Sequence, residues 1–364
     1  MSKKLGFGCS RLPLVDPDDS RSIDIAELSM MADIFIACGF DCFDVAPTYH
    51  DGRCEGAIRK ALTERYPRTS YRLCDKLPTM QVESAAAQER IVAEQLERCG
   101  VERFDRYMVH CATDEFYRRA EALGSFGFVL QMRDKGLTDE AGFSFHGSPE
   151  LLDDILTKYP DMDFVQLQIN YVDWELTPVA ARRCYETARR HGKPVVAMCT
   201  QKGGLLSGIP ATAAKILREV NPDASPSEWA LRFAASPEGV VTVLSGMSSL
   251  EEMRQNCAAM RNAQPLDAFE AQTLARAAAA IIESAPVQCT SCGYCVSSCP
   301  AGIPIPDYMA MGNTAGEPLP SDDTIRRGSA SECMACGMCE RRCPQHLRII
   351  DTLRRVVRRA AVTL

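Results

Sequence analysis

The sequence predicts an α/β fold: a (β/α)8 TIM barrel at residues 1–285, followed by a small, mainly α-helical domain at residues 286–364. Short apolar runs alternate with longer segments of helical period as far as residue 265, which is the order of strand and helix that a barrel requires. Beyond residue 288 the pattern changes to two cysteine-rich runs. A chain of 364 residues that is 46% hydrophobic can bury one large core and a small second one.

Eight apolar runs have the length and composition of buried strands. They are Leu5–Gly8, Phe40–Val45, Tyr71–Asp75, Phe104–His110, Ala141–Phe145, Phe164–Ile169, Val195–Met198 and Val240–Leu244. Eight segments place apolar residues three and four apart, as helices do. They are Asp24–Cys38, Gly52–Tyr66, Val82–Cys99, Phe116–Lys135, Glu150–Tyr159, Pro178–His191, Ser227–Ala235 and Leu250–Arg261. A doubly wound sheet shows the same alternation, but eight strand–helix units favour the barrel.

Two cysteine runs with the spacing C-x2-C-x2-C-x3-C-P begin at Cys289 and Cys333. In bacterial two-cluster ferredoxins this spacing binds two [4Fe–4S] clusters, and the fourth cysteine of each run binds the other run's cluster. On that rule cluster one uses Cys289, Cys292, Cys295 and Cys343, and cluster two uses Cys333, Cys336, Cys339 and Cys299. The alternatives are a pair of zinc ribbons or a disulfide framework, but tetrahedral zinc needs no third C-x2 step. The second domain is therefore expected to be ferredoxin-like.

Two further helices are expected around this domain. Asp267–Ile282 has a helical pattern, and residues 283–287 are expected to link it to the cysteine runs. Between the runs, residues 301–332 form a longer connection than a minimal ferredoxin needs. There the sequence Ile-Pro-Ile-Pro at 303–306 predicts a turn into a short helix, Asp307–Met311, capped by Asp307.

Composition predicts the compartment and excludes some partners. No stretch has the apolar length of a signal peptide core or a membrane helix, so we expect a cytoplasmic protein without a membrane span. Ten of the 18 cysteines lie outside the two runs, and we interpret them as buried thiols in the reducing interior of an anaerobe. Those near predicted strand ends are Cys42, Cys54, Cys74, Cys111 and Cys199. The net charge of −7 argues against nucleic-acid binding.

Four polar side chains follow three neighbouring strands of the predicted barrel: Asp44, Tyr49, Lys76 and His110. The carboxyl ends of barrel strands form the active face, so these residues are expected to lie together. Reduction of a carbonyl needs a proton donor at oxygen, and a tyrosine beside a lysine cation is expected to have a lowered pKa. We therefore predict Tyr49 as the acid, Lys76 as its neighbouring cation, Asp44 as the anchor of Lys76, and His110 as the donor that orients the substrate oxygen.

The segments that contain these residues resemble the aldo/keto reductase superfamily, specifically its branch with a C-terminal two-cluster ferredoxin-like domain. The similar segments are spread over most of the chain, at 5–13, 43–49, 75–78, 108–110, 142–146, 166–171 and 244–248. The resemblance implies a barrel that binds NAD(P)H and transfers hydride between it and a small carbonyl or alcohol substrate.

The resemblance also implies cofactor contacts. Ser144 and Gln166 match the residues that hold the nicotinamide carboxamide, and Met198 replaces the aromatic residue that commonly stacks on the ring. Lys202 is a candidate cation for the pyrophosphate, and the backbone amides where the Leu250–Arg261 helix begins are a candidate phosphate site. In NADPH-specific members of the family, basic residues hold the adenosine 2′-phosphate. The segment of this chain that corresponds to them contains Gly246, Ser248 and Asn256 and lacks those cations.

Three functions remain open at this point. The first is an oxidoreductase in which Tyr49 chemistry is coupled to the two clusters, with a flavin as a possible link and a redox partner protein as a possible donor. The second is an NAD(P)H carbonyl reductase with structural clusters. The third is an electron-transfer protein with a catalytically silent barrel, which the intact set of Asp44, Tyr49, Lys76 and His110 disfavours.

Overall fold

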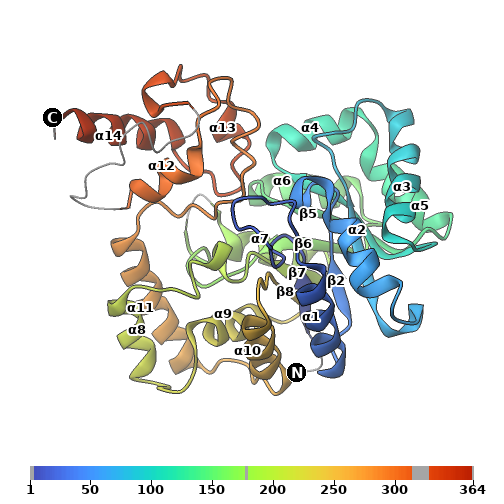
Figure 1. Ribbon diagram of the computed structural model, residues 1–364, viewed down its shortest axis with the longest axis horizontal. Helices are drawn as coiled ribbons and strands as arrows, with labels where there is room; N and C mark the ends of the chain where they lie inside the picture. Colours follow the sequence, from blue (N-terminus) through green and yellow to red (C-terminus); the bar gives the residue numbers. More distant parts are fainter. Residues whose placement is uncertain (1–3, 177–178, 314–327, 363–364) are drawn as a thin grey trace.

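The computed structural model of the chain describes residues 4–176, 179–313 and 328–362. Its centre is a closed barrel of eight parallel strands in sequential order (Figure 1). The strands are β1 (Leu5–Gly8), β2 (Cys42–Asp44), β3 (Arg72–Leu77), β4 (Phe104–Ala112), β5 (Thr138–Phe145), β6 (Phe164–Gln168), β7 (Val195–Met198) and β8 (Val240–Ser245). Strand β1 pairs with both β2 and β8, so the predicted barrel is confirmed and an open, doubly wound sheet is excluded.

Helices follow the strands around the barrel. They are α1 (Ile25–Ala37), α2 (Cys54–Ile58), α3 (Ala85–Cys99), α4 (Asp114–Ala122), α5 (Ser125–Asp134), α6 (Pro149–Lys158), α7 (Ala181–Arg190), α8 (Ala211–Arg218), α9 (Pro226–Ala235), α10 (Leu250–Arg261) and α11 (Ala268–Ser284). The single helix predicted at 116–135 is two helices, because Gly124 between them adopts a φ of 68°. Helix α8 lies in a segment for which the sequence predicted no element. The predicted extra helix is confirmed as α11, where Asp267 and Glu270 form a capping box.

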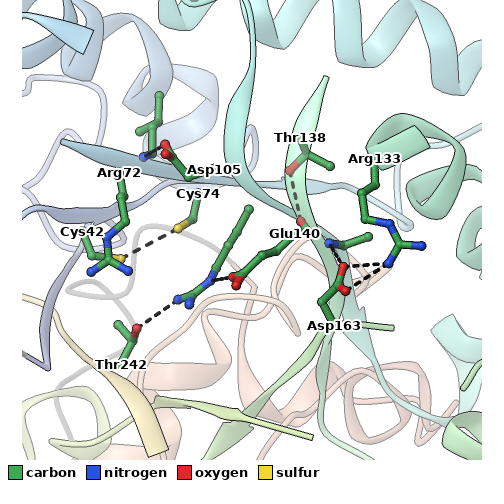
Figure 2. A network of polar contacts seen from close by, with 12 residues as sticks. Cys42, Arg72, Cys74, Asp105, Arg133, Thr138, Glu140, Asp163 and Thr242 are labelled. Atoms are coloured by element: carbon green, nitrogen blue, oxygen red, sulfur yellow. Dashed lines mark hydrogen bonds and ion pairs between the residues drawn. The ribbon is translucent and has the colours of Figure 1, made fainter. Parts of the chain in front are cut away.

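A polar network connects β4, β5 and β8 near the amino ends of these strands (Figure 2). Arg106, only 8% exposed, donates to Thr242 Oγ1 at 2.9 Å and pairs with Glu140. Beside it the thiols of Cys42 and Cys74 lie 3.8 Å apart, and both residues are buried. Side chains therefore occupy this end of the barrel, and the opposite end, at the carboxyl ends of the strands, is left for a binding site.

The second domain has its own core and is mainly helical, as predicted. Its helices are α12 (Ile305–Met311), α13 (Met338–Arg341) and α14 (Ile349–Val362), and Figure 1 shows them together in orange and red. Its buried apolar core includes Ile303, Met309 and Leu353. The predicted start of α12 is wrong: the helix begins two residues earlier, after Pro304, and has no side-chain cap. No helix in the described parts of the chain is long and apolar enough to cross a membrane.

The second domain lies against the carboxyl ends of the barrel strands. Arg11, after β1, donates to the carbonyl oxygen of Thr290 at 2.6 Å. Gly203, after β7, is so close that a β-carbon added to it would lie 2.5 Å from the same oxygen. The side-chain amides of Gln168, at the end of β6, and Gln345 exchange hydrogen bonds of 3.0 and 2.8 Å. The barrel mouth is therefore roofed by the cysteine-rich domain.

Candidate active site and cluster cavities

The four predicted catalytic residues come from three neighbouring strands and one tight turn. Asp44 ends β2, Lys76 lies in β3, and His110 lies in β4. Tyr49 begins the short helix η1 (Tyr49–Gly52), which directly follows the β2 end. Because parallel strands of a barrel end at one face, all four side chains meet at the mouth.

Lys76 is at the centre of the group. Its ammonium is 1% exposed and lies 2.5 Å from Asp44 Oδ1, 2.7 Å from the Val45 carbonyl oxygen and 4.9 Å from the centre of the Tyr49 ring. Burial raises the pKa of Asp44, and the Lys76 ammonium opposes that rise. A buried pair of this kind needs both partners, since removal of one leaves an uncompensated charge.

Tyr49 differs from the sequence-based expectation. Burial is the largest cause of a pKa raised well above 10, and the nearby Asp44 carboxylate adds to the rise. The expected lowering of this pKa is therefore not found in this structure, because desolvation and the negative charge of Asp44 both act in the opposite direction. The consequence is that Tyr49 holds its proton at neutral pH, which is the state that a proton donor needs.

His110 stands edge-on to Tyr49, with ring centres 6.1 Å apart. Burial, and then the charge of Lys76, lower the pKa of His110 well below 6.5, so the imidazole is neutral. Its Nδ1 is buried and has no hydrogen-bond partner among the described residues. Its Nε2 lies 3.3 Å from the hydroxyl of Tyr294.

Tyr294 is the residue at this site that sequence reasoning missed. It stands between Cys292 and Cys295 in the first cysteine run, and its ring centre lies 6.3 Å from that of His110. Nothing in its local pattern separates it from an ordinary spacer of a ferredoxin motif. Only the docking of the second domain on the barrel brings it to the mouth.

The residues predicted to hold a nicotinamide ring lie side by side. Ser144 and Gln166 are register partners in β5 and β6, and Gln166 Nε2 contacts Met198 Sδ at 3.5 Å. The Ser144 hydroxyl accepts from the backbone N–H of Cys111 at 2.7 Å. Gln166 Oε1 is buried and has no partner within the described residues, so it is free to accept a hydrogen bond from a carboxamide.

The residues predicted to hold phosphates do not fit that role. Lys202 is 1% exposed, and its ammonium lies 2.5 Å from Asp173 Oδ1 and 3.0 Å from Gln345 Oε1. This pairing argues against its predicted contact with a pyrophosphate, because the charge is neutralised inside the interface between the domains. The sequence could not show this, since Asp173 and Gln345 come from distant segments.

The predicted phosphate site at the start of α10 is also filled. The N–H of Ser248 and its hydroxyl both donate to the carboxylate of Glu252, at 2.7 and 3.0 Å, and the N–H of Leu250 donates to Glu27 Oε1 at 3.0 Å. Asn256 is buried and donates to the Ser245 hydroxyl. Two carboxylates thus occupy the amides that a phosphate needs.

Gly246, between β8 and α10, also contacts the protein where a contact with a dinucleotide was predicted. A β-carbon added to it would touch the side chain of Arg11 at 3.6 Å, so this backbone faces a protein side chain. In this structure the residues predicted to hold the nicotinamide lie together, whereas the amides and the cation predicted to hold phosphates are paired with carboxylates.

The eight cysteines of the two runs line two cavities. The first is lined by Cys289, Cys292, Cys295 and Cys343. The second is lined by Cys299, Cys333, Cys336 and Cys339. Each cavity therefore combines three thiols of one run with the fourth of the other, which fits two identical four-thiolate cofactors. The binding of iron by these thiols stays a prediction.

The first cavity is the one that faces the barrel. Thr290 and Gln345 line it, and both also bond to barrel residues. After burial, the Cys292 thiol contributes to the raised pKa of Cys111, near the end of β4, and of Cys199, directly after β7. The first set of cysteines thus adjoins the mouth where Tyr49 and His110 lie.

Comparison with known proteins agrees with this architecture. The family model "Aldo/keto reductase family" matches residues 4–279. The chain belongs to the aldo/keto reductase family. A second model, "4Fe-4S dicluster domain", matches residues 288–349, so this aldo/keto reductase has an iron–sulfur domain at its C-terminal end. No curated protein sequence matches the chain.

Solved structures of aldo/keto reductases share the barrel. One from Bacillus halodurans, in its holo form, is 24% identical, with a TM-score of 0.60 over 75% of this chain and 91% of its own. Another, from Klebsiella pneumoniae in complex with NADP and acetate, is 18% identical, with a TM-score of 0.59 over 75% of this chain and 90% of its own. At these identities the similarity shows the fold.

A titration with dinucleotides tests whether the carboxylates at the start of α10 disfavour a phosphate. We expect NADPH to bind no more tightly than NADH, because the carboxylates of Glu251 and Glu252 repel a 2′-phosphate. Fluorescence titration of the anaerobic protein measures both dissociation constants. Glu252→Gln is expected to improve NADPH binding more than NADH binding, whereas Glu219→Gln, a change at an exposed residue directly after α8, alters neither. A strong preference of the unaltered protein for NADPH contradicts this reading.

Replacement of Lys202 by methionine tests the interface. The change leaves the Asp173 carboxylate buried without its partner, and we expect the free energy of unfolding to fall by about 3–5 kcal/mol. Urea unfolding followed by circular dichroism measures the loss, with the exposed Lys215→Met as the control. A Lys202→Met protein as stable as the control contradicts the importance of this buried pair.

Proposed function

We propose that this protein is an iron–sulfur oxidoreductase that reduces a carbonyl, or oxidises an alcohol, at the barrel mouth. In this proposal the electrons pass between that site, the two clusters and a redox partner protein. The observation that supports it best is the position of the first cysteine cavity, which adjoins the mouth where the Asp44–Lys76 pair, Tyr49 and His110 meet.

The protein side chains handle the proton. Reduction of a carbonyl by two single electrons also takes up two protons, one on oxygen and one on carbon. Tyr49, whose pKa is raised by burial, holds the proton for oxygen at neutral pH, and solvent supplies the proton for carbon. The Lys76 ammonium lies over the Tyr49 ring and stabilises the phenolate that forms when the proton leaves. Asp44 keeps the ammonium charged and in place, and the neutral His110 orients the group that receives the proton.

The electrons are proposed to come from the clusters. A [4Fe–4S] cluster, when bound, supplies or accepts one electron at a time. Cys289, Cys292, Cys295 and Cys343 would hold the cluster nearer the site, and Cys299, Cys333, Cys336 and Cys339 the other. The filled phosphate positions at Lys202 and α10 favour this electron source over a dinucleotide.

An assay with a one-electron dye tests the proposal. The full chain, purified without oxygen, is mixed with reduced methyl viologen and benzaldehyde, and dye oxidation is followed with and without protein. We expect oxidation that depends on the aldehyde and on the protein and needs no nicotinamide. Absence of turnover with a broad panel of aldehydes, ketones and alcohols contradicts the proposal and favours a catalytically silent barrel.

The unpartnered oxygen of Gln166 favours a second candidate, an NAD(P)H-dependent carbonyl reductase with structural clusters. The Klebsiella pneumoniae relative contains NADP. In this chain the dinucleotide would have to displace Glu27 and Glu252 from the amides at the start of α10. Turnover with NADH or NADPH, and none with the dye, would favour this candidate.

A further inference from the structure

Tyr294 brings a second phenol to the catalytic group from the other domain. It is half-buried, and its hydroxyl lies 3.3 Å from His110 Nε2. The rings of Tyr49 and Tyr294 both stand edge-on to the His110 ring, at 6.1 and 6.3 Å between centres. The two phenols therefore lie around one imidazole.

The hydrogen-bond partners of His110 decide which group donates. A neutral imidazole has one N–H, and His110 is neutral because burial lowers its pKa. If the proton were on Nδ1, that N–H would be buried without an acceptor in the described structure, and an orphaned N–H is costlier than an orphaned lone pair. The proton therefore belongs on Nε2, and His110 donates to the oxygen of Tyr294.

This arrangement leaves the proton of Tyr294 unused. The hydroxyl of Tyr294 accepts from His110 and donates to no other described residue, and the Tyr49 hydroxyl makes no hydrogen bond within the described structure. The hydroxyl protons of Tyr49 and Tyr294 thus both lie at the barrel mouth without an acceptor among the described residues. A carbonyl or alcohol oxygen is the ligand that accepts from both.

We propose that Tyr294 contacts the substrate oxygen together with Tyr49, and that His110 is a positioning residue that acts through Tyr294. This inference rests on the proposed function and refines its site. It makes the second domain part of the substrate site, because the barrel alone contributes only one of the two donors. The ligand class is a carbonyl or alcohol whose oxygen is accessible to two phenols.

Tyr294→Phe in the full chain tests the proposal, with Tyr308→Phe as the matched control. Tyr308 is also a buried tyrosine of the cluster domain, but it belongs to that domain's own core. Iron and sulfide content, benzyl alcohol binding by calorimetry, and KM and kcat for benzaldehyde are measured. We expect Tyr294→Phe to keep its iron and to weaken benzyl alcohol binding and raise KM by about fivefold to tenfold, the effect of one hydrogen bond. The control changes none of these values.

A double variant separates the role of His110. If His110 acts through Tyr294, then His110→Phe combined with Tyr294→Phe raises KM no further than Tyr294→Phe alone. Additive effects overturn the positioning role. An unchanged KM in Tyr294→Phe, with turnover lost in Tyr49→Phe, overturns the proposal and leaves the proposed function standing.

Loss of iron in Tyr294→Phe but not in Tyr308→Phe also overturns the proposal, because it assigns the hydroxyl to cluster assembly. If Tyr49→Phe retains full turnover, the proposed function itself fails. The measurements therefore distinguish a failure of the proposed role of Tyr294 from a failure of the proposed function.

Discussion

Tyr49→Phe is expected to lower turnover of a carbonyl or alcohol by about 10²-fold or more, while substrate binding and cluster content survive. The substitution removes only the hydroxyl and leaves the ring under the Lys76 ammonium. Since the hydroxyl makes no hydrogen bond to the described residues, its loss leaves no buried group without a partner. The effect on kcat therefore reports proton transfer and not a change of fold.

Steady-state kinetics with reduced methyl viologen and benzaldehyde measure this effect, and Tyr185→Phe is the control. The Tyr185 hydroxyl donates to the Glu238 carbonyl oxygen, away from the mouth. Lys76→Met is expected to impair turnover by another route, because without the ammonium the pKa of Tyr49 rises further and transfer slows. Wild-type turnover in Tyr49→Phe would show that the family's acid chemistry does not operate here.

Removal of cluster ligands in pairs is expected to halve or abolish the iron content, depending on which run each cysteine comes from. Anaerobic protein should contain about eight iron and eight sulfide ions per chain. Cys299→Ala with Cys333→Ala removes two ligands of one predicted cluster and should leave about four iron ions. Cys299→Ala with Cys289→Ala removes one ligand from each and should destabilise both clusters.

The opposite ranking would show that each run binds its own cluster, and two zinc ions without sulfide would contradict the iron assignment. Cys257→Ala, which removes a buried thiol far from both runs in sequence, is the control and should leave the iron content unchanged. Iron and acid-labile sulfide analysis of each preparation is the measurement.

The barrel was predictable because its signals are local. Every strand contains an apolar run that is visible in the sequence, and β1 and β7 match their predicted bounds. Where the prediction failed, a backbone feature decided the outcome, as at Gly124, whose left-handed conformation divides one predicted helix into α4 and α5. The tetrad was predictable for a related reason, since each of its residues lies near the end of a recognisable strand or soon after it.

The surroundings of the tetrad were not predictable from the sequence. The burial of Lys202 depends on Asp173 and Gln345, which lie 29 and 143 positions away along the chain. The raised pKa of Tyr49 depends on its burial and on the Asp44 carboxylate beside it, and the place of Tyr294 depends on how the second domain docks. These are properties of the interface between two domains, for which a single sequence has no periodic signal.

The interleaving of the two cysteine runs has a consequence for biosynthesis. Each cavity takes thiols from both runs, so neither is complete until the chain has been synthesised at least to Cys339, and the one facing the barrel waits for Cys343. By then the ribosome has released all eight barrel strands. The barrel can therefore fold on the ribosome before the second domain covers its mouth. The iron–sulfur assembly machinery then acts on a folded barrel whose cluster domain is still incomplete. Delivery of iron to this chain is thus expected only after both cysteine runs have been synthesised.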